Sequence, residues 1–100
     1  MKIPDRAIAS DKALVSFFTE QAQQLGKIKG DDVLENAFGT VMFFNSLSEE
    51  RRAGILQKML EYLKKLKKKL DMIAKEWGVH SYSIALGFTG VTLSLEFEPK

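Results

Sequence analysis

The most regular pattern of hydrophobic and polar positions in the chain lies in residues 48–77. Its apolar side chains recur at alternating intervals of three and four residues over three heptads. They are Leu56, Met59, Leu63, Leu66, Leu70, Ile73 and Trp77. This spacing places all of them on one face of a single α-helix, which Gly78 is expected to end. At about 1.5 Å per residue the helix is about 43 Å long, whereas a domain of this size has a radius of gyration of about 13 Å. We therefore expect the rest of the chain to cover this helix along its length.

Residues 10–47 show the helical period in two shorter segments, which predicts a two-helix hairpin. The first helix has an N-cap at Ser10 or Asp11 and a stop at Gly26. Its apolar stripe faces the core and consists of Leu14, Phe17, Phe18, Ala22 and Leu25. Residues 1–9 are expected to form an extended lead-in.

The second helix opens at Asp31 or Asp32 and is apolar nearly all round at its end, because of Met42, Phe43 and Phe44. Two interpretations follow: the helix end is packed on two sides, or it forms an exposed patch that contacts a partner. Burial is the commoner explanation, and these residues are also candidates for self-association.

From residue 79 onward the hydrophobic period changes from 3.6 to 2, which predicts an antiparallel β-hairpin over residues 79–98. A two-residue turn at residues 89–90 pairs Phe88 with Val91. A four-residue loop over residues 87–90 keeps the same faces but shifts the pairing. In both cases one face of the hairpin is apolar.

The opposite face of this hairpin is small and uncharged as far as Glu96. It consists of Ser81, Ser83, Ala85, Gly87, Thr92 and Ser94. This face is either plain solvent surface or a flat contact for another subunit. Ser81, Ser83, Ala85, Thr92 and Ser94 are therefore further candidates for self-association.

These elements predict one α+β domain over residues 1–100, with two short helices, one long helix and a hairpin packed on them. A lone two-stranded hairpin is marginal in water and needs an apolar surface to lie on. Its two free edges favour strand addition, so we expect a homo-oligomer, a dimer above all. The contact is expected at the hairpin edges, at the heptad seam of the long helix, or at both, and pairing of the edges would complete a larger sheet.

The net charge of +2 is small, but its distribution is uneven. Residues 58–75 carry seven lysines and two acidic residues, for a local charge of +5. The lysines are Lys58, Lys64, Lys65, Lys67, Lys68, Lys69 and Lys75. Such a face is usually just solvated, but it is also a candidate contact for nucleic acid or another anion, including an anionic membrane surface. No arginine and no base-stacking aromatic residues interleave with these lysines, which disfavours nucleic acid.

Candidate chemistry changes this picture little. The chain has no cysteine, and one histidine, His80, cannot supply a zinc site by itself. Neither a nucleophile elbow nor a phosphate-binding glycine loop is present in the sequence. We expect no enzymatic activity, no cofactor, no metal, no small-molecule substrate and no transmembrane segment, and a cytoplasmic location.

The sequence therefore favours a small, non-enzymatic, self-associating structural or adaptor protein. Its contacts are expected at the hairpin edge and at the apolar helix surface. The alternative is a small nucleic-acid-binding protein that uses the lysine-rich face of the long helix.

Overall fold

The computed structural model describes residues 10–74, 76, 78–87 and 90–97, so the predicted lead-in over residues 1–9 lies outside the described residues. The elements in chain order are α1 (Asp11–Leu25), α2 (Asp31–Ser46), α3 (Glu49–Gly54), α4 (Leu56–Ile73), β1 (Val79–Gly87) and β2 (Gly90–Phe97). This order of helices followed by a hairpin confirms the predicted α+β class.

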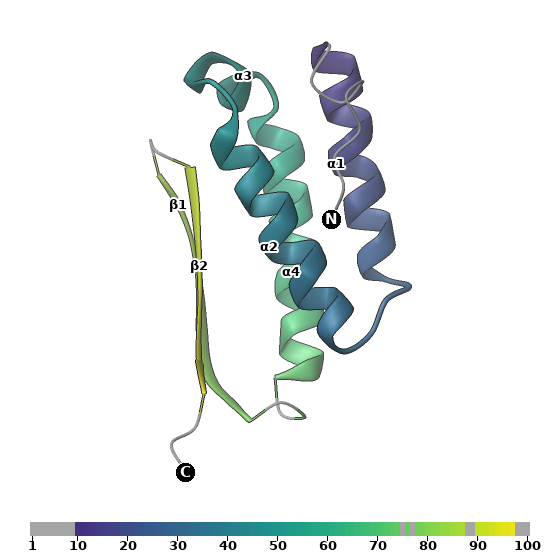
Figure 1. The fold of residues 1–100 in the computed structure, drawn as a ribbon, viewed down its shortest axis with the longest axis vertical. Coiled ribbons are helices and arrows are strands. Elements are labelled where there is room, and N and C mark those ends of the chain that lie inside the picture. The colour runs from purple at the N-terminus through teal and green to yellow at the C-terminus, as the bar shows by residue number, and fades with distance from the viewer. Residues whose placement is uncertain (1–9, 75, 77, 88–89, 98–100) are drawn as a thin grey trace.

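The elements form three layers (Figure 1). The hairpin lies on one side, α2 and α4 form the middle layer, and α1 covers the other side of the helices. Within this arrangement α1 packs most closely on α4, and β2 packs on α2. The helix-facing side of the hairpin and the helices share one hydrophobic core.

Both short helices begin close to the predicted positions, for different reasons. At the start of α1 the Ser10 hydroxyl accepts a hydrogen bond from the Ala13 N–H at 3.1 Å, as expected of an N-cap. The predicted apolar stripe of α1 is buried. By contrast, α2 begins at Asp31, directly after Gly30, which has a φ of 59° and forms no side-chain cap. The negative charges of Asp31 and Asp32 in its first turn instead interact favourably with the positive end of the helix dipole.

The single long helix predicted over residues 48–77 is divided at Ile55 into α3 and α4. Two causes act together. Gly54 disfavours helix by about 1 kcal/mol relative to alanine, and α3 buries no side chain that would hold it on the axis of α4. The bend brings Ile55 into the core, where it is 1% exposed, while the predicted seam residue Leu56 stays 38% exposed.

At its other end α4 stops at Ile73, before the predicted end at residue 77, and the predicted stop signal at Gly78 follows. Gly78 has a φ of 67°, and the Val79 N–H donates to the Ala74 carbonyl oxygen at 3.0 Å. A left-handed glycine beside such a bond is the usual way to end a helix. The predicted seam residue Trp77 lies outside the described residues.

The buried face of α4 contains Tyr62, which the apolar spacing does not include. Its hydroxyl donates to Asn36 Oδ1 at 2.5 Å, and Asn36 Nδ2 donates to Gln21 Oε1 at 3.0 Å. This buried chain of hydrogen bonds joins α4, α2 and α1. Burial raises the pKa of Tyr62 well above its ordinary value. The nearby Thr40 hydroxyl opposes this rise, although it forms no hydrogen bond of normal geometry within the described residues.

The hairpin has the second of the two predicted registers. Leu86 pairs with Val91, so the pairing predicted with a turn at residues 89–90 is wrong and the shifted pairing of the alternative is the observed one. The four-residue loop of that alternative is not, because Gly87 and Gly90 also pair and belong to the strands. Because the two registers differ by two residues, the apolar and small faces are the same in both.

A side chain of α2 attaches the hairpin to the helices. Asn45 Nδ2 donates to the Val91 carbonyl oxygen at 2.8 Å, and Asn45 Oδ1 accepts from the Val91 N–H at 2.7 Å. The amide group thus bonds to β2 as a neighbouring strand would. Gly90 permits this approach, because it has a φ of 125° and any Cβ there would overlap the Asn45 amide.

We expect Asn45→Ala to lower the free energy of unfolding by about 1–3 kcal/mol. The reason is that the N–H and the C=O of Val91 both lose their hydrogen bonds to the Asn45 side chain. Chemical denaturation measures the change. Met42→Ala on the same helix is the control, since Met42 is 70% exposed. Equal stability of the two variants would contradict the role assigned to Asn45.

Candidate functional site

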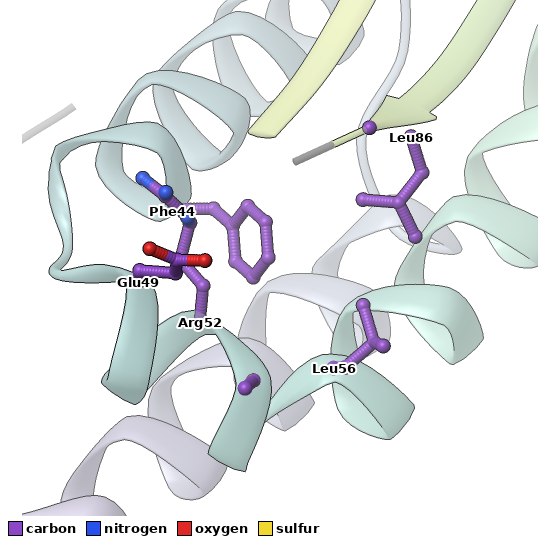
Figure 2. Close-up of a pocket in the computed structure, with 7 residues that line it drawn as sticks. Phe44, Glu49, Arg52, Leu56 and Leu86 are labelled. Atoms are coloured by element: carbon purple, nitrogen blue, oxygen red, sulfur yellow. The ribbon is translucent and has the colours of Figure 1, made fainter. Parts of the chain in front are cut away.

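An open groove of about 490 Å³ lies between the end of β1 and the bend from α3 to α4. Its lining is mostly apolar and consists of Phe44, Glu49, Arg52, Ala53, Leu56, Leu86 and Gly87. Figure 2 shows the side chains of Leu56 and Leu86 pointing toward each other, with the Phe44 ring beside them. Leu56 and Leu86 are each 38% exposed. The end of β1 therefore stands above a space that the helices do not fill.

The groove has two charged side chains, Glu49 and Arg52, and Arg52 helps to hold the fold. Arg52 Nη1 donates to the carbonyl oxygens of Asn45 and Leu47 at 3.2 and 3.0 Å, at the end of α2. The positive charge of Arg52 there interacts favourably with the negative end of the α2 dipole. The groove thus offers apolar contact area rather than a set of free acid and base groups.

The two outer edges of the hairpin differ. On the outer edge of β2, the Asn45 amide forms hydrogen bonds with the N–H and the C=O of Val91. On the outer edge of β1, no further strand is present among the described residues. Residues 81–87 of β1 contain neither a charged residue nor a proline. Those are the features that natural proteins use to block pairing at an edge. Within the described residues, residues 81–87 of β1 therefore carry none of these blocking features and no neighbouring strand.

The sequence candidates for self-association divide into two groups. Those on the hairpin, Ser81, Ser83, Ala85, Thr92 and Ser94, are all exposed and lie together on its outer face. At one end of this face the Ser81 hydroxyl donates to Glu96 Oε2 across the strands at 3.1 Å. On α2, Phe43 and Phe44 are buried while Met42 is exposed, so these three residues do not form a surface patch.

The aromatic residues at the end of α2 are core residues for a clear reason. The centroid of the Phe43 ring lies 4.8 Å from that of the Phe17 ring and 5.8 Å from that of the Phe18 ring of α1. Such aromatic contacts stabilise the helix pair. The commoner of the two interpretations of this apolar helix end, burial, is the observed one.

The lysines of α4 do not form a narrow stripe. Three consecutive ones, Lys67, Lys68 and Lys69, span about 200° of the helix at 3.6 residues per turn. Lys64, Lys65, Lys67 and Lys68 are exposed, Lys58 and Lys69 are half-buried, and Lys75 lies outside the described residues. Two of them form ion pairs, from Lys58 to Glu61 at 3.3 Å and from Lys67 to Asp71 at 3.7 Å.

A second groove, of about 410 Å³, brings three of these lysines together between α1 and α4. Lys58, Lys64 and Lys65 line it, next to Phe18 and Ala22 of α1. The sequence did not reveal this groove, because its two walls are about 40 residues apart in the chain and nothing local couples them.

The helix-facing side of β1 reaches α4 through Tyr82. Its hydroxyl donates to Asp71 Oδ1 and lies 3.4 Å from the Lys67 carbonyl oxygen. Burial, together with the hydrogen bond to Asp71 and the negative charge of that carboxylate, raises the pKa of Tyr82 to about 12. Asp71 thus joins β1 to α4 and also pairs with Lys67.

Metal-binding and membrane-spanning features are both missing from the described part of the chain. Its His, Asp and Glu residues nowhere gather three or more side chains that could hold a metal ion. None of its helices combines the length and the apolar character that a membrane span requires.

We expect the tyrosinate absorbance of the folded protein to appear at about pH 12, not at the ordinary tyrosine value of 10.0. Because the folded pKa of Tyr82 lies above the unfolded one, this group stabilises the fold fully below about pH 10. That stabilisation is lost as the pH rises toward 12. Asp71→Asn should lower the midpoint, whereas Asp32→Asn, which changes a carboxylate in the first turn of α2, should not. A wild-type midpoint near pH 10 would contradict the contact.

Comparison with known proteins identifies no relative: the chain matches no protein-family model, no curated protein and no solved structure. Function is therefore inferred from the surfaces described above.

Proposed function

We propose that this chain is a small, non-catalytic, self-associating module that contacts its partner by strand addition at the edge of β1. The observation that carries the proposal is the difference between the two edges of the hairpin. Asn45 occupies β2 at Val91, while β1 keeps an uncharged edge with no neighbouring strand in the described part of the chain. Strand addition uses main-chain hydrogen bonds for affinity and neighbouring pockets for specificity.

Two further features support an interaction rather than a catalytic role. The groove under the end of β1 is mostly apolar, and its arginine holds the end of α2. The outer face of the hairpin carries small, exposed side chains, so a partner can approach the sheet without meeting charged groups between residues 81 and 87. A cytoplasmic location stays a prediction from the sequence.

We expect the molar mass in solution to approach twice the 11.3 kDa of one chain as concentration rises. The double variant Ser83→Lys with Ala85→Lys should remain monomeric, because it places lysines at the edge of β1 in both copies. Like charges brought together at an interface cost several kcal/mol, so the dissociation constant should rise at least about 100-fold. Light scattering over a dilution series measures both proteins.

The matched control is Thr92→Lys with Ser94→Lys, which introduces the same charge on the same face but on β2. This control should associate nearly as the wild type does. A wild-type protein that is monomeric at every concentration would overturn the proposal.

A second candidate function, anion or nucleic-acid binding, is favoured by one observation. Lys58, Lys64 and Lys65 line the groove between α1 and α4, and Lys68 is exposed on the same helix. Phosphate contacts by such residues would make binding strongly dependent on salt. The spread of the lysines around α4 and the two ion pairs among them make this the weaker candidate.

We expect the variant with Lys64, Lys65, Lys67 and Lys68 replaced by glutamine to self-associate as the wild type does, because these residues lie outside the edge of β1. Light scattering measures the mass, and retention on immobilised DNA and RNA at low salt measures nucleic-acid binding. Salt-sensitive retention of the wild type that the variant loses would instead establish the second candidate.

A further inference from the structure

The bonds of Asn45 reveal which backbone groups of β1 point outward. Val91 gives both its N–H and its C=O to Asn45, so it exchanges no backbone hydrogen bonds with Leu86, its partner on β1. In an antiparallel pair such residues alternate with hydrogen-bonded ones. The N–H and C=O groups of Tyr82, Ile84 and Leu86 therefore lie on the outer edge of β1.

The residue sizes along β1 are symmetric about Ile84. Ser83 and Ala85 are small, Tyr82 and Leu86 are large, and the next residues on either side, Ser81 and Gly87, are small again. An antiparallel strand of the same sequence, centred on the same residue, thus places large side chains opposite large ones on the helix-facing side. It places small ones opposite small ones on the outer face. A twofold contact requires this self-complementarity.

We propose that a second copy of this chain pairs its β1 antiparallel with β1, with Ile84 of each copy opposite the other and Tyr82 opposite Leu86 of the second copy. This register rests on the proposed function and specifies it further. The three outward residues of each copy then exchange about six main-chain hydrogen bonds. The two-stranded sheets join into one sheet of four strands in the order β2, β1, β1 of the second copy, β2 of the second copy.

The groove under β1 agrees with this arrangement. Tyr82 of the second copy lies on the same side of the sheet as Leu86 and directly opposite it, at the Leu86 end of the groove in Figure 2. The ring can shield apolar surface there that one chain leaves exposed on Leu56 and Leu86.

A disulfide test is well suited to this register, because the chain has no cysteine of its own. The register makes Ser83 and Ala85 of the second copy a pair without mutual hydrogen bonds, with Cα atoms about 4.5 Å apart, within the range that disulfides bridge. Ser83→Cys with Ala85→Cys should form a covalent dimer under mild oxidation, and the peptide map should join position 83 of one copy to position 85 of the other. The control Thr92→Cys with Ser94→Cys, with the same spacing on β2, should stay uncrosslinked.

Amide hydrogen exchange on the wild-type protein gives a second measurement that needs no substitution. The amides of Tyr82, Ile84 and Leu86 should become at least about tenfold more protected as concentration rises through the association range, because they gain main-chain partners there. The amide of Leu93, which points outward on β2, should not.

The outcomes separate this register from the proposed function. Suppose that the wild-type protein dimerises. The register is then overturned if the cysteine variant forms no disulfide between positions 83 and 85, or if the amide of Ile84 gains no protection in the wild type. Self-association itself would still stand. Equal crosslinking of the β2 control also overturns the register. A monomer at every concentration overturns both.

Discussion

The pair of hydrogen bonds between the Asn45 amide and the Val91 backbone is the contact on which the architecture depends. A hairpin of two strands is marginal by itself, and these bonds connect it to a helix that precedes it by 46 residues in the chain. The side-chain amide has the donor and acceptor of a peptide group, so it can occupy the place of a neighbouring strand. The apolar face of the hairpin is then held against α2 and α4.

The bend at Ile55 supports this contact from the other side. Because α3 leaves the axis of α4, Arg52 reaches the carbonyl oxygens of Asn45 and Leu47 at the end of α2. Those carbonyls would otherwise lack partners at a helix terminus. The positioned helix end in turn presents the Asn45 side chain to β2. The interruption that shortens the long helix therefore helps to place the hairpin.

One consequence is that the hairpin has two unlike edges. Asn45 bonds to β2 at Val91, whereas β1 has no neighbouring strand on its outer edge among the described residues. The space under the end of β1 is lined in part by Phe44, Leu56 and Leu86. The lysine charge is spread around α4 and partly neutralised by Glu61 and Asp71. The groove under β1 is instead mostly apolar, with Glu49 and Arg52 as its charged residues.

Local patterns in the sequence were sufficient for the class of the fold, both short helices, the stop at Gly78 and the faces of the hairpin, because periods of 3.6 and 2 residues report burial within one element. They could not choose between two registers that expose the same faces. The single helix predicted over residues 48–77 also missed the break at Ile55, although the apolar spacing begins only at Leu56, after Gly54. Only the tertiary structure decided these points, together with the burial of Tyr62 and the occupation of Val91 on one sheet edge by Asn45. The burial of Tyr62 and the occupation of Val91 depend on contacts between residues that lie 26 and 46 positions apart in the chain, and such contacts leave no periodic trace in the sequence.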